Sequence, residues 1–161
     1  MKLHLLSDLH LNVSHLEMPR TDADVVVLAG DIARPKEAVA WASGFAQPVL
    51  YVIGNHEFYG GYIDGTAQEL KRLSAGTGIR VLDCDEIVMN GVRFLGMTLW
   101  TDFMLFGAGD PREQAIEQAR TFTRDFSRIR LDEAPGALFS PATATALFNR
   151  HRSWLLARLD E

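Results

Sequence analysis

The sequence has 161 residues, of which 47% are hydrophobic and 23% are charged. These values are typical of a soluble globular protein and predict one domain, residues 1–161. The net charge of −5 argues against an extended nucleic-acid-binding face, because such a surface repels phosphate backbones. No apolar run is long enough to cross a membrane. The single cysteine, Cys84, cannot form an intramolecular disulfide, which predicts a cytoplasmic protein.

The first half of the chain predicts three strands and one helix. The strands cover residues 2–7, 24–29 and 48–53, and the second is apolar throughout, as in a strand that is buried on both faces. Pro35, followed by an alanine-rich segment, predicts the start of a helix between the second and third strands. This order implies right-handed crossovers and a mostly parallel sheet, and therefore an α/β fold.

The second half predicts further helices and a hairpin. Asn90-Gly91 between two alternating apolar runs indicates a two-residue hairpin turn. The aromatic segment 100–109 suits either a lid or a loop that packs on the domain, and packing is favoured. The remaining predicted elements are a helix over 64–74, a strand over 79–82, a helix from Pro111 to about Ser127, and a helix that begins at Ser140-Pro141.

Three histidines and the cysteine fit structural roles. His4 lies within the first strand and is expected to be packed or partly exposed, whereas His15 lies in a loop and is expected to be exposed. His151 lies on the apolar side of the last helix, which is typical of a core histidine that has a hydrogen-bond partner. Cys84 has no histidine near it in sequence, so a packing role at a strand end is favoured over a nucleophilic one.

Polar side chains follow each of the three predicted strands. Asp8-Leu9-His10 follows the first, Gly30-Asp31 the second and Gly54-Asn55-His56-Glu57 the third. Each motif alone is also typical of turns at strand ends. Their occurrence after three successive strands indicates a ligand site, because open α/β sheets bind ligands at the carboxyl ends of their strands.

These residue types predict a centre with two divalent metal ions. Carboxylate, imidazole and amide groups without thiolates suit Mn²⁺, Fe or Zn²⁺. Asp8 and His10 point the same way if they continue an extended strand, and Asp31 has two oxygens with which to bridge both ions. Asn55 offers a neutral oxygen to the second ion. Two ions roughly 3.5–4 Å apart can activate a bridging hydroxide and hold a phosphoryl group, and His56 is placed to donate a proton to the leaving alcohol.

The three motifs together resemble the first signature blocks of the calcineurin-like metallophosphoesterases. This resemblance implies a β-sandwich flanked by helices, a four-layer α/β/β/α fold. It assigns Asp8 and His10 to the first metal, Asp31 to the bridge, Asn55 to the second metal and His56 to the leaving group or transition state. In topology the resemblance spans the chain, but its specific motifs occupy only the first sixty residues.

The sequence departs from that family in two places. The later histidine blocks are absent, since His151 is the only histidine after Glu57, so the chain is expected to be the N-terminal portion of the domain, with the fold incomplete at its C-terminus. Arg34-Pro35 follows the second motif, where the Ser/Thr protein phosphatase branch has Asp-Arg-Gly. A small-molecule or cyclic-nucleotide phosphoesterase is therefore favoured over a protein phosphatase.

Two classes of function remain open at this point. The leading hypothesis is a metallophosphoesterase, a hydrolase of phosphate mono- or diesters acting on a small substrate. The alternative is a non-catalytic domain with the same fold that works as a binding module, and a nuclease comes third because of the acidic charge. An incomplete fold also predicts a weak second metal site and an uncovered sheet through which the chain self-associates.

Overall fold

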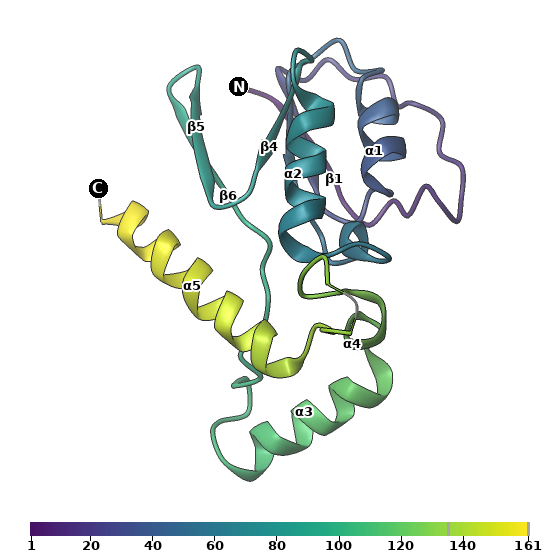
Figure 1. Cartoon of the computed structure of the whole chain (residues 1–161). Coiled ribbons are helices and arrows are strands. Elements are labelled where there is room, and N and C mark those ends of the chain that lie inside the picture. The colour runs from purple at the N-terminus through teal and green to yellow at the C-terminus, as the bar shows by residue number, and fades with distance from the viewer. Residues whose placement is uncertain (135, 161) are drawn as a thin grey trace.

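The structure, a computed structural model, describes residues 1–134 and 136–160. It has the predicted α/β architecture, with helices beside a parallel sheet and a separate hairpin (Figure 1). The elements in chain order are β1 (Leu3–Leu6), β2 (Val25–Ala29), α1 (Pro35–Ala42), β3 (Val49–Val52), the 3-10 turn η1 (His56–Phe58), α2 (Ile63–Ser74), β4 (Ile79–Leu82), β5 (Asp85–Met89), β6 (Val92–Gly96), α3 (Asp110–Phe122), α4 (Asp125–Arg128) and α5 (Pro141–Leu159).

The main sheet has four parallel strands in the order β1-β2-β3-β4. Because side chains alternate along a strand, each strand contributes to two cores. The larger core lies between the sheet and helices α1 and α2, and includes Val26, Leu28 and Tyr51. The smaller one, around Val25 and Leu50, lies on the opposite face, where the hairpin packs. In the part of the chain that the structure describes, the second layer of strands is the β5-β6 hairpin, so the full four-layer sandwich stays a prediction.

Two helices and the hairpin turn begin at the residues that the sequence predicted. Pro35 begins α1, and the Ser140 hydroxyl accepts a hydrogen bond from the Thr143 amide, 3.2 Å away, at the start of α5. In the hairpin, Asn90 and Gly91 have φ angles of 50° and 76°, the left-handed pair that a two-residue turn requires.

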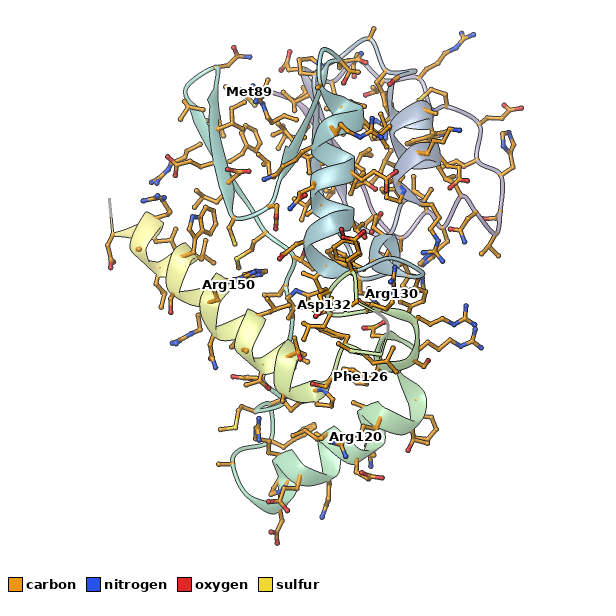
Figure 2. The ribbon with its side chains drawn as sticks, in the orientation of Figure 1. Met89, Arg120, Phe126, Arg130, Asp132 and Arg150 are labelled. Carbon is orange, nitrogen blue, oxygen red and sulfur yellow. The ribbon has the colours of Figure 1, made fainter. Side chains whose placement is uncertain are left out.

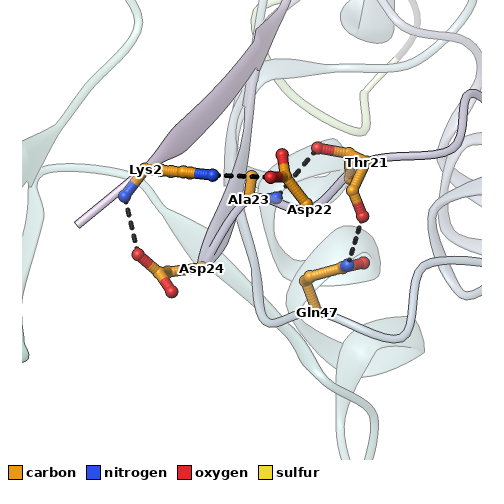
Figure 3. A network of polar contacts seen from close by, with 6 residues as sticks. All are labelled: Lys2, Thr21, Asp22, Ala23, Asp24 and Gln47. Atoms are coloured by element: carbon orange, nitrogen blue, oxygen red, sulfur yellow. Dashed lines mark hydrogen bonds and ion pairs between the residues drawn. The ribbon is translucent and has the colours of Figure 1, made fainter.

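Polar contacts fix the amino ends of β1 and β2 beside each other (Figure 3). The Lys2 amide donates to an Asp24 carboxylate oxygen 2.6 Å away, and the Lys2 ammonium pairs with Asp22 at the same distance. The Gln47 side chain donates to the Thr21 carbonyl, 3.0 Å away, and so joins the loop before β3 to the loop before β2. Exposed contacts of this kind contribute little energy but order the strand ends.

The segment after the hairpin differs from the prediction. The helix expected to reach Ser127 ends at Phe122, and α4 begins separately at Asp125. Two β-branched threonines near the break weaken helix formation. None of the side chains of α3 is buried, and Arg120, which Figure 2 labels, is exposed.

The aromatic segment 100–109 divides into a packed part and an exposed part. Trp100 is buried and Phe103 packs against the larger core, as the favoured interpretation required. Leu105 and Phe106 are instead almost fully exposed. Among the helices of the described residues, none is both long and apolar enough for a bilayer crossing.

The face of β1 that points away from α1 is apolar and open. Leu3 is 51% exposed and Leu5 is 65% exposed, and β1 is also an edge strand, which favours pairing with another chain. We expect Leu3→Thr combined with Leu5→Thr to lower self-association, measured by light scattering, without a large loss of thermal stability. Val13→Thr makes a similar apolar-to-polar change at an exposed loop residue and should leave self-association unchanged. Unchanged association in the double variant would contradict the role of this face.

Candidate metal centre

The ends of β1, β2 and β3 bring three predicted site residues together. The segment after β1 lies along the segment after β2, because the Asp8 amide donates to the Gly30 carbonyl (3.1 Å) and the His10 amide to the Asp31 carbonyl (2.9 Å). In consequence His10, Asp31 and His56 each offer a ligand atom, and these atoms lie within 4.8 Å of one another. The ring centroids of the two histidines are 4.5 Å apart.

The backbone at the site is left-handed, and this corrects one prediction. Asp8, His10 and Asp31 have φ angles of 55°, 46° and 58°, a conformation that costs about 1–3 kcal/mol at a non-glycine residue and is common at functional sites. β1 ends at Leu6, so Asp8 and His10 do not continue an extended strand. Asp8 is exposed, accepts a hydrogen bond from the Ser7 hydroxyl, and lies outside the His10–Asp31–His56 cluster.

Two glycines allow the strand ends to approach closely. A Cβ atom on Gly54 would lie 2.1 Å from Asp31 Oδ1 and 2.4 Å from the Asp31 amide nitrogen. Gly30 has a φ of 90°, and its Cβ would lie 2.8 Å from the Cα of Gly54. Only glycine fits at such contacts. The close approach lets Asp31 Oδ1 accept a hydrogen bond from the His56 amide, 3.0 Å away.

Glu57 joins the ends of β2 and β3 from within the core. Its side chain is 1% exposed, and its two oxygens accept hydrogen bonds from four neutral donors: the amides of Asp31 (3.0 Å), Ile32 (2.7 Å) and Gly54 (2.9 Å), and the Tyr51 hydroxyl (2.7 Å). Burial, and then the nearby Glu57 carboxylate, raise the pKa of Tyr51 well above its ordinary value. The phenol therefore stays protonated and donates.

The His56 ring is held on one side by aromatic stacking. It stacks on Tyr59 with ring centroids 4.4 Å apart and an angle of 24° between the planes. The Arg34 guanidinium lies over the Tyr59 ring, 5.5 Å from its centroid, and donates a hydrogen bond to the His56 carbonyl. His56 thus lies among the ligand-type groups in a fixed orientation, which suits a metal ligand as well as the predicted proton donor.

Asn55 contacts a residue that the sequence did not single out. Its side-chain amide donates to Asp125 Oδ1, 2.8 Å away, and the Tyr59 hydroxyl donates to the same oxygen, 2.7 Å away. Asp125 belongs to α4, is 8% exposed and lies 70 residues after Asn55 in the chain. No local motif in the sequence signals this contact.

The other histidines have the structural roles predicted for them, and Cys84 is half-buried after the end of β4. His151 is 3% exposed, and its Nδ1 lies 2.8 Å from the Thr98 carbonyl oxygen. His4 is half-buried beside Phe45, and His15 is exposed. Burial raises the pKa of the Cys84 thiol, which disfavours the nucleophilic thiolate.

Cavity size alone does not reveal the cluster. A cavity of about 740 Å³ opens between the hairpin and the amino ends of β3 and β4, near Pro48 and Gly78. The cluster lies at the opposite, carboxyl ends of the strands. It is the chemistry of the donor set that marks it: two imidazoles and one carboxylate suit Zn²⁺, Fe or Mn²⁺.

Comparisons with known proteins give a fold but no family. No protein-family model matches the chain, and no curated protein sequence matches it. A solved structure that is similar to it is the crystal structure of phosphopantetheinyl hydrolase (PptH) from Mycobacterium tuberculosis. The TM-score is 0.71 at 20% sequence identity, and the match covers 99% of this chain and 63% of that one.

This match corrects the family expected from the motifs. The resemblance to the calcineurin-like metallophosphoesterases has no matching family model behind it, and the similar structure carries the name of a different hydrolase. The chain is therefore not assigned to the calcineurin-like metallophosphoesterases. The chain spans about 63% of the length of the phosphopantetheinyl hydrolase chain, with which it shares a fold.

Proposed function

We propose that this chain contains the metal-binding part of a hydrolase that cleaves phosphate mono- or diesters with two divalent ions. The single observation that carries the proposal is the cluster of His10, Asp31 and His56, whose ligand atoms lie within 4.8 Å of one another. Asp31 would bridge the ions, with Asp8 and His10 on the first and Asn55 on the second. For this role Asp8 must turn from the Ser7 hydroxyl toward the cluster.

The residues around the cluster would have different roles in the reaction. Bound ions would generate the attacking nucleophile and neutralise the charge of the phosphoryl group. His56, held by Tyr59 and Arg34, would give its proton to the leaving oxygen. Glu57 and Gly54 would keep Asp31 in place, since both contact it directly.

The substrate we propose is a small phosphoester. The net charge of −5 disfavours long nucleic acids, and the single cysteine suits the reducing cytoplasm as the place of the reaction. The structurally similar protein is named a phosphopantetheinyl hydrolase, so a phosphopantetheinyl ester is the first natural compound to test.

Hydrolysis of bis(p-nitrophenyl) phosphate and p-nitrophenyl phosphate tests the proposal. We expect turnover that requires Mn²⁺, Fe²⁺ or Zn²⁺, stops with a chelator and returns when metal is added. His15→Ala, at an exposed loop histidine, should keep full activity. A chain that binds these ions with correct folding but hydrolyses neither ester nor a phosphopantetheinyl ester would contradict the proposal.

One observation favours a second candidate, a binding module that holds a single ion. The cluster has three ligand-type residues without Asp8. Three ligands are enough for one ion, and they leave too few for a second ion. Metal analysis separates the two candidates. Two ions per chain with turnover support the hydrolase, whereas one ion without turnover supports the binding module.

His56→Ala distinguishes a proton donor from a ligand. If His56 donates a proton, we expect the metal content to stay nearly unchanged and turnover to fall by about 10²–10⁴-fold. The loss should be smallest for nitrophenyl esters, whose leaving groups need little protonation, and largest for alkyl esters. A variant that loses bound metal would instead show that His56 is a ligand. An equal loss on both types of ester would also contradict the proton-donor role.

A further inference from the structure

We infer that Asp125 is a positioning residue, which orients the Asn55 amide so that its carbonyl oxygen faces the metal cluster. This inference rests on the proposed function. The hydrogen bond from Asn55 Nδ2 to Asp125 Oδ1 is 2.8 Å long. A carboxylate can only accept hydrogen bonds, so it must bind the NH₂ end of the amide. The other end of the amide, Oδ1, is the atom that a divalent cation prefers, and it is directed away from Asp125.

Tyr59 holds Asp125 in turn. The Tyr59 hydroxyl donates to the same Asp125 oxygen, 2.7 Å away. Burial, and then the hydrogen bond to Asp125, raise the pKa of Tyr59 well above its ordinary value, so the phenol remains a donor. Because the Tyr59 ring also stacks on His56, one side chain contacts both the proposed proton donor and the residue that orients Asn55.

Packing around α4 holds Asp125 beside Asn55. Phe126, labelled in Figure 2, stacks on Phe139 with ring centroids 5.8 Å apart, and Ile129 is fully buried. The Gly60 amide donates to the Arg128 carbonyl, 2.9 Å away, which ties α4 to the loop after η1. The segment outside the sheet therefore takes part in the site, and it does so through a buried carboxylate. Groups that orient metal ligands in this manner are typically worth about 10–100-fold in metal affinity.

A double-mutant cycle tests the inference, with Mn²⁺ alone as the probe. The variants of the full chain are Asp125→Ala, Asn55→Ala and the two combined, and Mn²⁺ affinity is measured by calorimetry. We expect Asp125→Ala to weaken the weaker Mn²⁺ site by about 10–100-fold. If Asp125 acts only through Asn55, the double variant should bind Mn²⁺ within about twofold of Asn55→Ala. Fully additive losses would overturn the inference.

Asp125→Asn separates positioning from simple charge attraction. Both hydrogen bonds end on the same oxygen, Oδ1, and an asparagine at this position can accept both with its carbonyl. We therefore expect Asp125→Asn to retain Mn²⁺ affinity within a few-fold. A loss as large as that of Asp125→Ala would show that the negative charge matters instead, and would overturn the positioning role.

Two controls exclude unfolding and the general effect of removing a carboxylate as causes of weaker Mn²⁺ binding. Thermal unfolding shows whether Asp125→Ala stays folded. If it does not, the Mn²⁺ affinity of Asp125→Asn still tests the positioning role. Asp64→Ala removes an exposed carboxylate from the first turn of α2 and should leave Mn²⁺ binding unchanged. Normal turnover and binding in folded Asp125→Ala would overturn this inference while the proposed function stands. Binding of Mn²⁺ without any turnover would contradict the proposed function while the cycle still tests Asp125.

Discussion

Asp31→Asn should lower Mn²⁺ affinity and turnover more than any other single change at the site. The substitution removes the charge that two cations would share, so we expect a loss of more than about 100-fold, beyond the 10–100-fold typical of groups that only orient ligands. Asparagine has the same shape as aspartate and keeps an oxygen that can accept the hydrogen bond from the His56 amide. In the unsubstituted protein this bond is 3.0 Å long. It also tolerates a φ of 58° better than most residues, so the fold should survive.

Calorimetric titration with Mn²⁺ and metal analysis measure this effect. Asp64→Asn, at an exposed position in α2, is the matched control and should bind Mn²⁺ as the parent does. Asn55→Ala should weaken only the weaker site and leave it measurable. If Asp31→Asn retained two tightly bound ions, the bridging role would be wrong.

Glu57→Ala should cause the largest loss of folding stability. It leaves three backbone amides and the Tyr51 hydroxyl without their acceptor in a place that is 1% exposed. Each unsatisfied buried donor costs about 1–3 kcal/mol, so a total of at least roughly 4 kcal/mol is expected. That is a large part of the 5–15 kcal/mol that stabilises a typical domain, and it would lower the Tm by about 10 °C or more.

Urea and thermal unfolding followed by circular dichroism measure the change. Tyr51→Phe is the matched control, because it removes only one of the four donors and should cost about 0.5–1.5 kcal/mol. Glu57→Gln keeps the size but places an NH₂ group among amide donors, so an intermediate loss is expected. A Glu57→Ala protein as stable as the parent would mean that water replaces the carboxylate at no cost.

Much of the fold could be predicted because its signals are local. The apolar run of β2 indicated a buried strand, Pro35 marked the start of a helix, and Asn90-Gly91 specified the hairpin turn. Parallel strands with carboxyl ends at one edge then brought His10 and Asp31 within reach of each other. Periodicity and turn chemistry were sufficient for each of these steps.

The errors arose where tertiary contacts overrode the local pattern. Asp8 was expected to follow an extended strand, but the chain turns left-handed at this point, and the side chain does not join the cluster. Glu57 was noted only as the end of a motif, because its four donors come from β3 and from the segments that follow β2 and β3. Asp125 lay within an expected continuous helix, and its contact with Asn55 spans 70 residues. Such long-range pairing leaves no signal in a single sequence.

The contact between Asn55 and Asp125 also has a consequence for how the protein matures on the ribosome. His10, Asp31 and His56 lie in the first 56 residues and come from strands that pair in chain order. At synthesis rates of about 5–20 residues per second, Asp125 emerges on the order of ten seconds after Asn55. The ribosome therefore delivers all three residues of the cluster before it delivers the carboxylate that fixes the Asn55 amide, so the orientation of Asn55 is set after those residues are made.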